Sequence, residues 1–266
     1  MYPELFSLGP LTVYSYGVLL AVSYLLGLQL ARWRASKWGL DGNRVLDLGI
    51  YIIIAALLGA KLLLLVVDFD QFRRSPAEIL TIFRSGGVFY GGLILALLVA
   101  FWYINKHRLP FWTTCDVFAP GIALGLVTGR LGCLAAGCCY GARTDVPWAI
   151  TFTNPLASPQ GTPLGVPLHP TQLYESAAAL IILLALLFLE RKGRPFAGRT
   201  MWLFMFLYAT ARFVIEFYRG DPRGEVFNAL STSQFISLIL APLSLGMLIY
   251  LSRGTSGHGI HRPARA

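Results

Sequence analysis

The sequence predicts an all-α, polytopic integral membrane protein with about seven transmembrane helices. Hydrophobic residues make up 56% of the 266 residues, and charged residues only 13%, about half of the ~25% that is usual in a soluble domain. The apolar residues also gather in continuous runs of spanning length, which is ~20 residues for a helix. A disordered chain cannot carry so much apolar surface and is excluded.

Seven apolar runs have the length of a membrane span. We expect helices at approximately 11–30, 46–67, 86–104, 116–139, 170–189, 200–218 and 231–251. The runs do not alternate between apolar and polar residues as strands of a transmembrane barrel do. No Lys or Arg precedes the first run, so it lacks the positive region of a cleavable signal peptide.

The domain organisation follows from these runs. We expect a single transmembrane catalytic domain over residues 1–251 and a flexible cytoplasmic tail over residues 252–266, which are rich in Gly, Ser and Arg.

The basic residues between the runs predict the orientation. Thirteen Lys and Arg residues lie in the C-terminal tail and in the connections after the first, third and fifth runs, and six lie in the opposite connections. Because cytoplasmic loops are enriched in Lys and Arg, we expect the N-terminus outside and the C-terminus in the cytoplasm. Topology thus explains most of the +9 net charge. No nucleic-acid partner is expected, because a basic stripe would have little water-facing surface to occupy.

Five ionisable residues fall within or at the ends of the spans. Lys61, Arg130 and Arg212 belong to the second, fourth and sixth runs, and Glu175 and Glu216 to the fifth and sixth. Such groups are costly at membrane depth and by default mark a functional site. The alternative is a structural pair of Arg212 with Glu216, four residues later on the same helix face, and a Lys61 that snorkels to the interface. Three cations against two carboxylates leave positive charge for an anionic lipid or lipid-like substrate.

A segment at the end of the fourth run is unusually rich in glycine and cysteine. Residues 129–141 read Gly-Arg-Leu-Gly-Cys-Leu-Ala-Ala-Gly-Cys-Cys-Tyr-Gly, and small residues allow a backbone or ligand to approach closely. Three interpretations of the cysteines stay open: burial as small apolar residues, a disulfide on the oxidising outer side, or a metal or nucleophilic role. No metal is expected, because the C-x-x-C spacing of zinc motifs is absent.

Two further polar features lie near the outward ends of the spans. His169 opens the segment His-Pro-Thr-Gln-Leu-Tyr-Glu, in which Thr171 is a candidate N-cap of the next helix. His169 is a candidate for proton transfer because His titrates near neutral pH, and a structural hydrogen bond is the alternative. Tyr90 lies between two Gly pairs in residues 86–92, a pattern typical of close backbone approach, and its hydroxyl needs a partner.

These motifs together resemble the prolipoprotein diacylglyceryl transferase family. Residues 129–141 are similar to the family signature, which begins Gly-Arg and ends in Gly. Residues 169–175 are similar to its His-Pro-Ser-Gln-Leu-Tyr-Glu. Residues 208–221 contain its Arg-Phe…Glu-Phe frame, and Ser15-Tyr16-Gly17 looks like its early Tyr-Gly. The resemblance extends from the first to the seventh run.

The resemblance implies a transferase of the bacterial cytoplasmic (inner) membrane that acts in lipoprotein biosynthesis. Members of the family transfer the diacylglyceryl group of phosphatidylglycerol to the lipobox cysteine of a prolipoprotein signal peptide and release glycerol 1-phosphate, without a cofactor. A cationic pocket suits a phosphate leaving group. Two alternatives stay open: a paralogue that transfers a lipid group to another acceptor, and a non-catalytic phospholipid-binding protein on the same scaffold.

The resemblance also implies which residues form the site. The expected catalytic residues are Arg130, Arg212, Tyr90, Glu216, His169 and Glu175. The expected substrate-binding residues are Arg130, Arg212, Tyr16, Lys61, Tyr208, Gly141, Cys133 and Cys138.

The chain departs from the family pattern at several positions. Tyr90 stands where the family typically has His, and tyrosine, with a reference pKa of about 10, is a poorer base at neutral pH. Cys133 and Cys138 stand where the signature usually has Asn and Glu, and Ala136 replaces a second Asn. The arginines that would bind phosphate are retained, while the hydrogen-bonding part of the signature is rebuilt.

Overall fold

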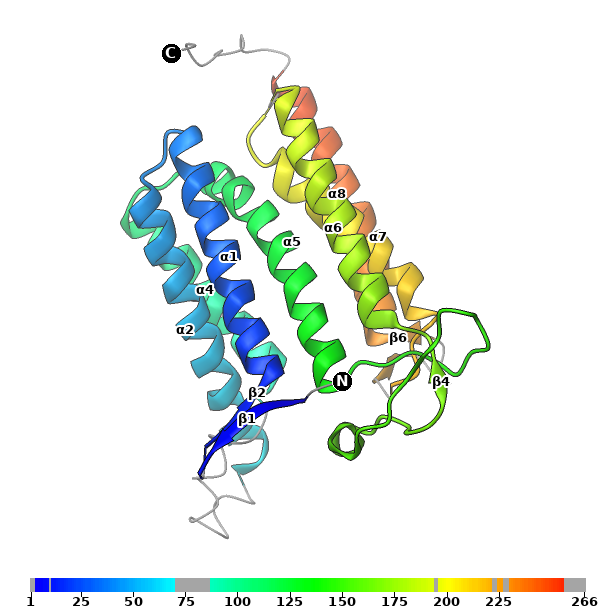
Figure 1. Ribbon diagram of the computed structural model, residues 1–266. Helices are drawn as coiled ribbons and strands as arrows, with labels where there is room; N and C mark the ends of the chain where they lie inside the picture. Colours follow the sequence, from blue (N-terminus) through cyan, green and yellow to red (C-terminus); the bar gives the residue numbers. More distant parts are fainter. Residues whose placement is uncertain are drawn as a thin grey trace. The chain divides into compact units, whose positions relative to one another are not determined.

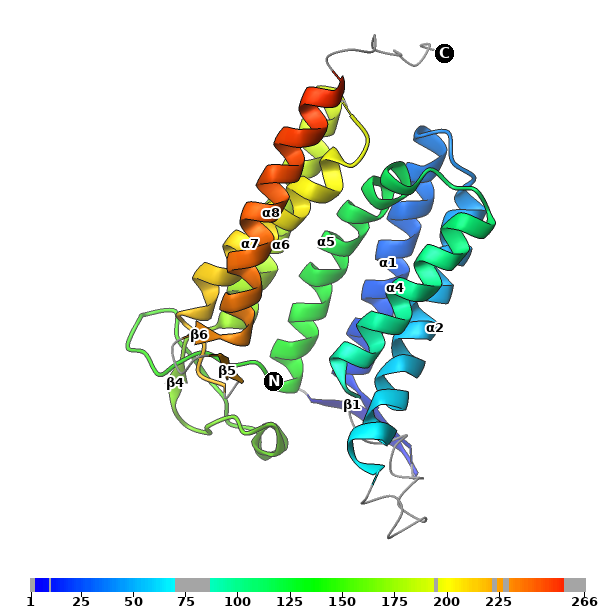
Figure 2. The same cartoon turned by 180° about the vertical axis from the view of Figure 1, so that it is seen from behind.

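The computed structural model describes residues 3–9, 11–69, 87–193, 196–221, 224–226 and 230–255. The elements of this part of the chain are mostly long helices (Figures 1 and 2). The α-helices are α1 (Ser15–Lys37), α2 (Gly42–Val67), α4 (Phe89–Lys106), α5 (Phe111–Ala136), α6 (Thr171–Arg191), α7 (Arg199–Glu216) and α8 (Thr232–Thr255). One helix corresponds to each predicted run, so the all-α class is confirmed.

Short strands lie in the connections. They form three antiparallel pairs: β1 (Glu4–Leu8) with β2 (Leu11–Tyr14), β3 (Ile150–Thr151) with β4 (Pro167–Leu168), and β5 (Glu225–Val226) with β6 (Leu230–Ser231). A single 3-10 helix, Pro155–Gln160, is found among the described residues. Every one of these strands is shorter than the ~9 residues that a membrane strand needs.

The chain divides into two compact units, which we describe separately. The first unit comprises residues 1–30 and 115–266, and the second comprises residues 31–114. Most of α1 and α5 and all of α6, α7 and α8 belong to the first unit, and α2 and α4 belong to the second.

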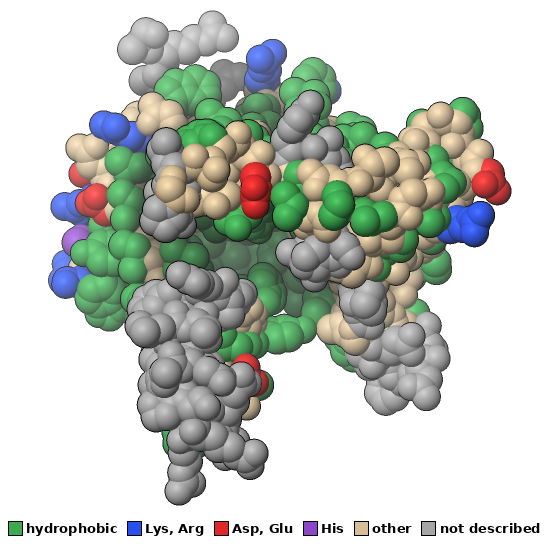
Figure 3. Space-filling view, turned by 60° about the horizontal axis from the view of Figure 1, so that its bottom comes forward, with side chains coloured by type: hydrophobic (Ala, Val, Ile, Leu, Met, Phe, Trp, Pro, Cys, Tyr) green, Lys and Arg blue, Asp and Glu red, His purple; other side chains and the backbone are tan. Residues whose placement is uncertain are grey.

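Six of the helices are long and apolar enough to cross a membrane; α7 does not meet this criterion, and it contains Arg199, Arg212 and Glu216. Large apolar side chains are widely exposed on the helices. On α6, Ile181 and Leu184 are 67% and 58% exposed. The space-filling view also shows many hydrophobic and few charged side chains (Figure 3). Soluble proteins rarely expose such surfaces, and the chain is a multi-pass membrane protein.

Glycines bring α2 and α4 together in the second unit. A side chain at Gly91 would collide with the carbonyl oxygen of Gly59, and a Cβ at Gly92 would lie 2.7 Å from the carbonyl oxygen of Ala56. The close backbone approach predicted around Tyr90 is therefore confirmed for Gly91 and Gly92.

In the first unit, α6, α7 and α8 lie side by side (Figures 1 and 2). Ile182 and Leu186 of α6 and Phe204 of α7 form a buried cluster with Ala119 and Ala123 of α5. This packing holds together α5, α6 and α7, the helices that carry the ionisable residues predicted in this unit.

The buried carboxylate of Asp116 fixes the start of α7. Its two oxygens accept hydrogen bonds from the backbone N–H groups of Gly198 (2.7 Å) and Met201 (2.9 Å). Asp116 is fully buried, so it satisfies two N–H groups that the first turn of a helix leaves without partners. Asp116 thus links the start of α7 to α5.

Several helix ends differ from the sequence prediction. The first helix was expected from residue 11, but residues 11–14 form β2 and α1 begins at Ser15. The fourth helix was expected to reach residue 139, but α5 ends at Ala136 because Gly137 adopts a left-handed conformation with φ +79°. The N–H groups of Gly137 and Cys138 donate to the carbonyls of Leu134 and Cys133, which is a Schellman motif. At the other end of the chain, α8 continues to Thr255, so the first residues of the expected tail are helical. The rest of the tail, 256–266, lies outside the described residues.

Candidate active site

Glu175 of α6 is the centre of a buried ion cluster. Its Oε2 lies 2.7 Å from Nη2 of Arg130 on α5, and its Oε1 lies 2.6 Å from Nη1 of Arg219. Nη1 of Arg212 on α7 is 3.7 Å from the same Oε1. The Glu175 side chain is only 4% exposed, and a buried carboxylate needs such partners to remain charged. The structure thus joins Arg130, Arg212 and Glu175, as the sequence predicted.

Arg212 and Glu216 form a second pair in this cluster. Arg212 Nη2 lies 2.6 Å from Glu216 Oε2, one turn later on α7, and it also donates to Oγ of Ser233 (3.1 Å) on α8. The predicted common helix face of the two residues is confirmed. Because Arg212 also approaches Glu175, the pair is part of the larger cluster.

Arg219 and Asp221 complete the cluster, and neither was among the site residues predicted from the sequence. Arg219 donates from Nε and Nη2 to the two oxygens of Asp221, both at 2.8 Å. Burial acts to lower the pKa of Arg219, but Asp221 and Glu175 raise it overall above its usual value, so this guanidinium stays charged. Arg219 is one of the six basic residues that the sequence places in the outward connections. Its position three residues after Glu216, one turn beyond the helix, is the feature of the sequence that could have predicted a place in the cluster.

The cluster is electrically balanced, which corrects the expected surplus of positive charge. Three guanidiniums face the carboxylates of Glu175, Glu216 and Asp221, whereas Lys61 belongs to the second unit. An anion must therefore bind through spare donors rather than through net charge, and each guanidinium has five N–H groups. The Arg130 side chain is 18% exposed, against 8% for Arg212 and 3% for Arg219. Arg130 is the most accessible of the three.

His169 lies in a hydrogen-bonded aromatic group. Its Nδ1 is 3.1 Å from the hydroxyl of Tyr174, which accepts a 2.7 Å hydrogen bond from Nε1 of Trp148. The Tyr174 oxygen can accept a second hydrogen bond, so a neutral His169 that donates to it from Nδ1 leaves the lone pair of Nε2 free. The Tyr218 ring packs edge-on against the imidazole at 5.2 Å.

Gly141 connects this group to the arginine cluster through backbone contacts. Its N–H donates to the carbonyl of His169 (3.1 Å), and the next N–H, of Ala142, donates to the carbonyl of Tyr218 (2.8 Å). A Cβ at Gly141 would collide with the His169 carbonyl and lie 2.8 Å from that of Tyr218. The structure gives Gly141 a packing role, and its expected contact with substrate remains a prediction.

Three thiols lie together beside the cluster. The sulfur atoms of Cys133, Cys138 and Cys139 all lie within 4.8 Å of one another. The Thr171 hydroxyl donates to the carbonyl of Cys139 (2.9 Å). Thr171 was expected to be the N-cap of this helix, but it is the first residue of α6, and Pro170 is the N-cap. Hydrogen bonds from the other two thiols, with the charges of Arg219 and Arg130, lower the pKa of Cys139.

The remaining predicted residues lie on four helices, α1, α2, α4 and α7. A Cβ at Gly132 would lie 3.4 Å from the ring of Tyr16, so α1 and α5 touch beside the thiols. Tyr208 stacks on Phe204 with 5.7 Å between ring centroids. Tyr90 and Lys61 belong to α4 and α2 of the second unit. Tyr90 is half exposed, and its ring packs edge-on against Phe89 at 5.8 Å. The functional roles of all four predicted residues remain predictions.

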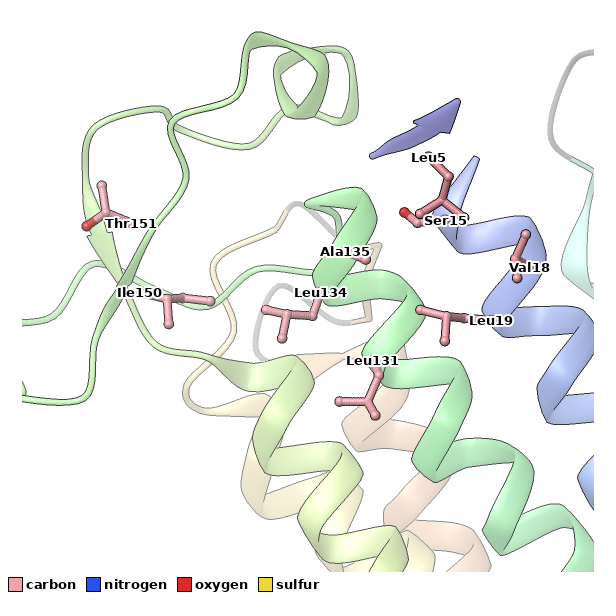
Figure 4. A pocket seen from close by; sticks show the side chains of 9 residues that line it. All are labelled: Leu5, Ser15, Val18, Leu19, Leu131, Leu134, Ala135, Ile150 and Thr151. Carbon is pink, nitrogen blue, oxygen red and sulfur yellow. The ribbon is translucent and has the colours of Figure 1, made fainter. Parts of the chain in front are cut away.

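An apolar pocket opens along α5 in the same unit. Its volume is about 700 Å³, and the polar residues among those that line it are Ser15 and Thr151. Figure 4 shows Leu131, Leu134 and Ala135 of α5 facing the pocket. Arg130 directly precedes Leu131, so one helix carries both a guanidinium of the ion cluster and the wall of an apolar pocket.

Comparisons with known proteins show which family the chain resembles. The family model for prolipoprotein diacylglyceryl transferase matches residues 3–250. A phosphatidylglycerol–prolipoprotein diacylglyceryl transferase of Clostridium tetani is 37% identical over 94% of this chain and 97% of its own length. Proteins with that description from Clostridium perfringens and Aeromonas salmonicida are both 36% identical, over 90% and 89% of this chain and 91% and 85% of their own lengths. The match of the family model to nearly the whole chain and these identities lead to one conclusion: the chain belongs to the prolipoprotein diacylglyceryl transferase family.

Proposed function

We propose that this protein transfers the diacylglyceryl group of phosphatidylglycerol to the lipobox cysteine thiol of prolipoproteins. The relatives carry the name of this reaction. The observation that carries the proposal is the meeting of three guanidiniums at the carboxylate of Glu175. Such a group of Arg side chains is suited to a phosphodiester, because the planar fork of donors matches two oxygens of a phosphate.

The reaction requires the phosphate to leave. The thiol sulfur attacks the glycerol carbon that bears the phosphate, a C–S bond forms and the C–O bond breaks. Glycerol 1-phosphate leaves with the bonding electron pair, and the thiol proton passes to a base. Arg130, the most accessible guanidinium, contacts the phosphate and stabilises the developing charge. Arg212 and Arg219 are more deeply buried and hold Glu175 in place.

Two residues are candidates for the base. In the tautomer whose Nδ1–H donates to the Tyr174 oxygen, Nε2 of His169 has a free lone pair that accepts the thiol proton. Tyr90 occupies the family's usual His position, but its phenol is a weak base unless it is deprotonated. We assign the proton to His169.

The apolar pocket beside Arg130 accommodates an acyl chain of the lipid. Its lining is almost wholly hydrocarbon, and its volume of about 700 Å³ is in the range of ligand sites, ~300–1,000 Å³. A phospholipid joins a charged phosphate to apolar chains, and α5 presents partners for both within two turns.

The site lies on the outward side of a bacterial inner membrane in this proposal. Lys37, Lys106 and Lys192 lie over aromatic rings at the C-terminal ends of α1, α4 and α6, as expected for interfacial anchors. These three ends belong to the side with more Lys and Arg. The ion cluster forms at the other end of α6, where secreted prolipoproteins arrive.

The test is replacement of an endogenous transferase. A host depleted of its own enzyme and supplied with this chain should mature its prolipoproteins, and the purified protein should release glycerol phosphate from phosphatidylglycerol when given a lipobox peptide. Arg130→Ala and Arg212→Ala should abolish both. Arg44→Ala is the matched control, because Arg44 is half exposed and pairs only with Asp41 at 3.7 Å among the described residues.

Other outcomes would contradict the proposal. Unmodified prolipoprotein in cells that express the wild-type chain well would exclude the reaction. Lipid binding without release of glycerol phosphate would indicate a non-catalytic phospholipid-binding protein. Full activity in both arginine variants would exclude the phosphate contact.

A further inference from the structure

Cys133, Cys138 and Cys139 take no part in the reaction as proposed above. Their three sulfurs lie within 4.8 Å of one another, and all three thiols are free in the structure. Three thiolates bound to one ion at ~2.3 Å, the Zn–S distance, have their sulfurs about 4 Å apart. The observed cluster therefore needs little rearrangement to hold an ion.

We propose that Cys133, Cys138 and Cys139 form a three-thiolate binding site for a thiophilic metal ion of the zinc or copper(I) class. This property goes beyond the transfer reaction and does not depend on it. Thiolate donors select such soft ions over Mg²⁺ or Ca²⁺. The described residues supply three ligands, so water completes a tetrahedral zinc site, or the ion stays three-coordinate.

The backbone holds the thiols in position before any ion binds. Gln172 Nε2 donates to the carbonyl of Cys138 (2.7 Å), and the Thr171 hydroxyl donates to that of Cys139 (2.9 Å). Both donors are fully buried at the start of α6. Cys139 has a φ of +61°, which is uncommon for a residue with a side chain and which these contacts maintain. Ligands held in this way lose little freedom on binding.

The surrounding charges suit a thiolate complex. Binding of a divalent ion to three thiols releases three protons to solvent and leaves a complex with a net charge of −1. The guanidinium of Arg130 interacts electrostatically with Cys133 and Cys139, and that of Arg219 with Cys139, so both favour a negative complex. A disulfide would use only two of the sulfurs, whereas a metal ion uses the whole cluster.

The experiment measures metal binding directly. The full chain, purified in detergent under reducing conditions, is given Zn²⁺ alone, passed over a sizing column and assayed for zinc. We expect about one zinc per chain and a sulfur shell at ~2.3 Å in X-ray absorption. Cys133→Ser, Cys138→Ser and Cys139→Ser should each weaken binding by more than ~100-fold, because loss of even a supporting group around a metal costs 10–100-fold.

Cys115→Ser is the matched control. Cys115 lies 18 residues before Cys133 on α5, about 27 Å along the helix axis, so zinc should still bind. The double variant Cys133→Asn with Cys138→Glu places the family's usual residues at both positions and guards against a variant that fails to fold. It should lose zinc while it remains monodisperse.

Three results would overturn the site. These are a chain that retains no zinc, equal loss of zinc in the Cys115→Ser variant, and a disulfide among the three sulfurs in the reduced, purified protein. Retained transfer activity in a chain that binds no zinc would reject this inference and leave the proposed reaction standing.

Discussion

Arg219 and Glu175 lie 2.6 Å apart, although 44 residues separate them in the sequence. Arg219 follows the last turn of α7, and Glu175 occupies the first turns of α6. Their contact connects the ends of two helices, and Asp221 holds the other edge of the same guanidinium. The site is therefore a network that depends on each of its charges.

Glu175→Gln should both destabilise the protein and inactivate it. The substitution keeps the shape of the side chain but leaves three buried guanidiniums with too few anions, and breaking a buried ion pair costs about 3–5 kcal/mol. Thermal unfolding in detergent measures the loss. Glu4→Gln, at an exposed position of β1, should leave the midpoint unchanged. An unaltered midpoint in Glu175→Gln would show that the carboxylate does not hold the cluster together.

Arg219→Lys should lower the transfer rate by about tenfold or more, because the ammonium group has no fork with which to contact both oxygens of Asp221. Asp221→Asn should produce a smaller loss of the same kind. The measurement is kcat with phosphatidylglycerol and a lipobox peptide. Arg44→Lys serves as the control at an exposed position. Wild-type kcat in Arg219→Lys would show that positive charge alone is sufficient there.

Gly141→Ala should destabilise the protein strongly, because the added methyl group would meet the backbone carbonyls of His169 and Tyr218. Neither carbonyl can move without breaking its own hydrogen bond. Gly246→Ala is the matched change in α8, where nothing lies within 4 Å of the new atom, and it should stabilise the helix by about 1 kcal/mol. Equal unfolding temperatures for the two variants would contradict the packing role.

Asp116→Ala should displace α7 and lower activity at a distance from the ion cluster. The variant leaves the N–H groups of Gly198 and Met201 buried without acceptors, at a cost of about 1–3 kcal/mol each. Asp41→Ala removes the exposed N-cap of α2, which accepts from Asn43, and should cost only about 1 kcal/mol. The unfolding free energies of the two variants test this ranking, and a larger loss for Asp41→Ala would reverse it.

His169→Gln should reduce kcat far more than Tyr90→Phe does, since we assign the thiol proton to the imidazole. Tyr174→Phe is the informative companion, because it removes the hydroxyl at Nδ1 and keeps the ring. It should lower kcat more than it changes KM. A severe defect in Tyr90→Phe with normal activity in His169→Gln would move the base to α4.

The sequence was sufficient to predict the helices and part of the ion cluster. The runs of apolar residues determine where helices form, and charges inside those runs have few functions other than binding, so Arg130, Arg212, Glu175 and Glu216 were identifiable. Arg219 and Asp221 lie just outside a run, where charged residues are ordinary. Only the geometry at the end of α7, which turns the chain back toward Glu175, distinguishes them from loop residues. The predicted surplus of positive charge was wrong because the prediction left out Arg219 and Asp221 and counted Lys61.

The cysteines show a different limit. The sequence places the three thiols within seven residues but does not show which of them meet. That depends on the end of α5 at Gly137, which lies between Cys133 and Cys138. The left-handed turn at Gly137 brings Cys138 and Cys139 back beside Cys133, and this reversal is a property of backbone dihedral angles that the spacing alone did not reveal.

The turn at Gly137 also explains how such a substitution is tolerated. Cys133 contributes its carbonyl to the turn, and Cys138 contributes its amide, so the turn makes no demand on either side chain. Asparagine and glutamate, or two thiols, can occupy these positions on the same backbone frame. The side chains at positions 133 and 138, next to Arg130, can therefore change their chemistry while the backbone of this segment stays the same.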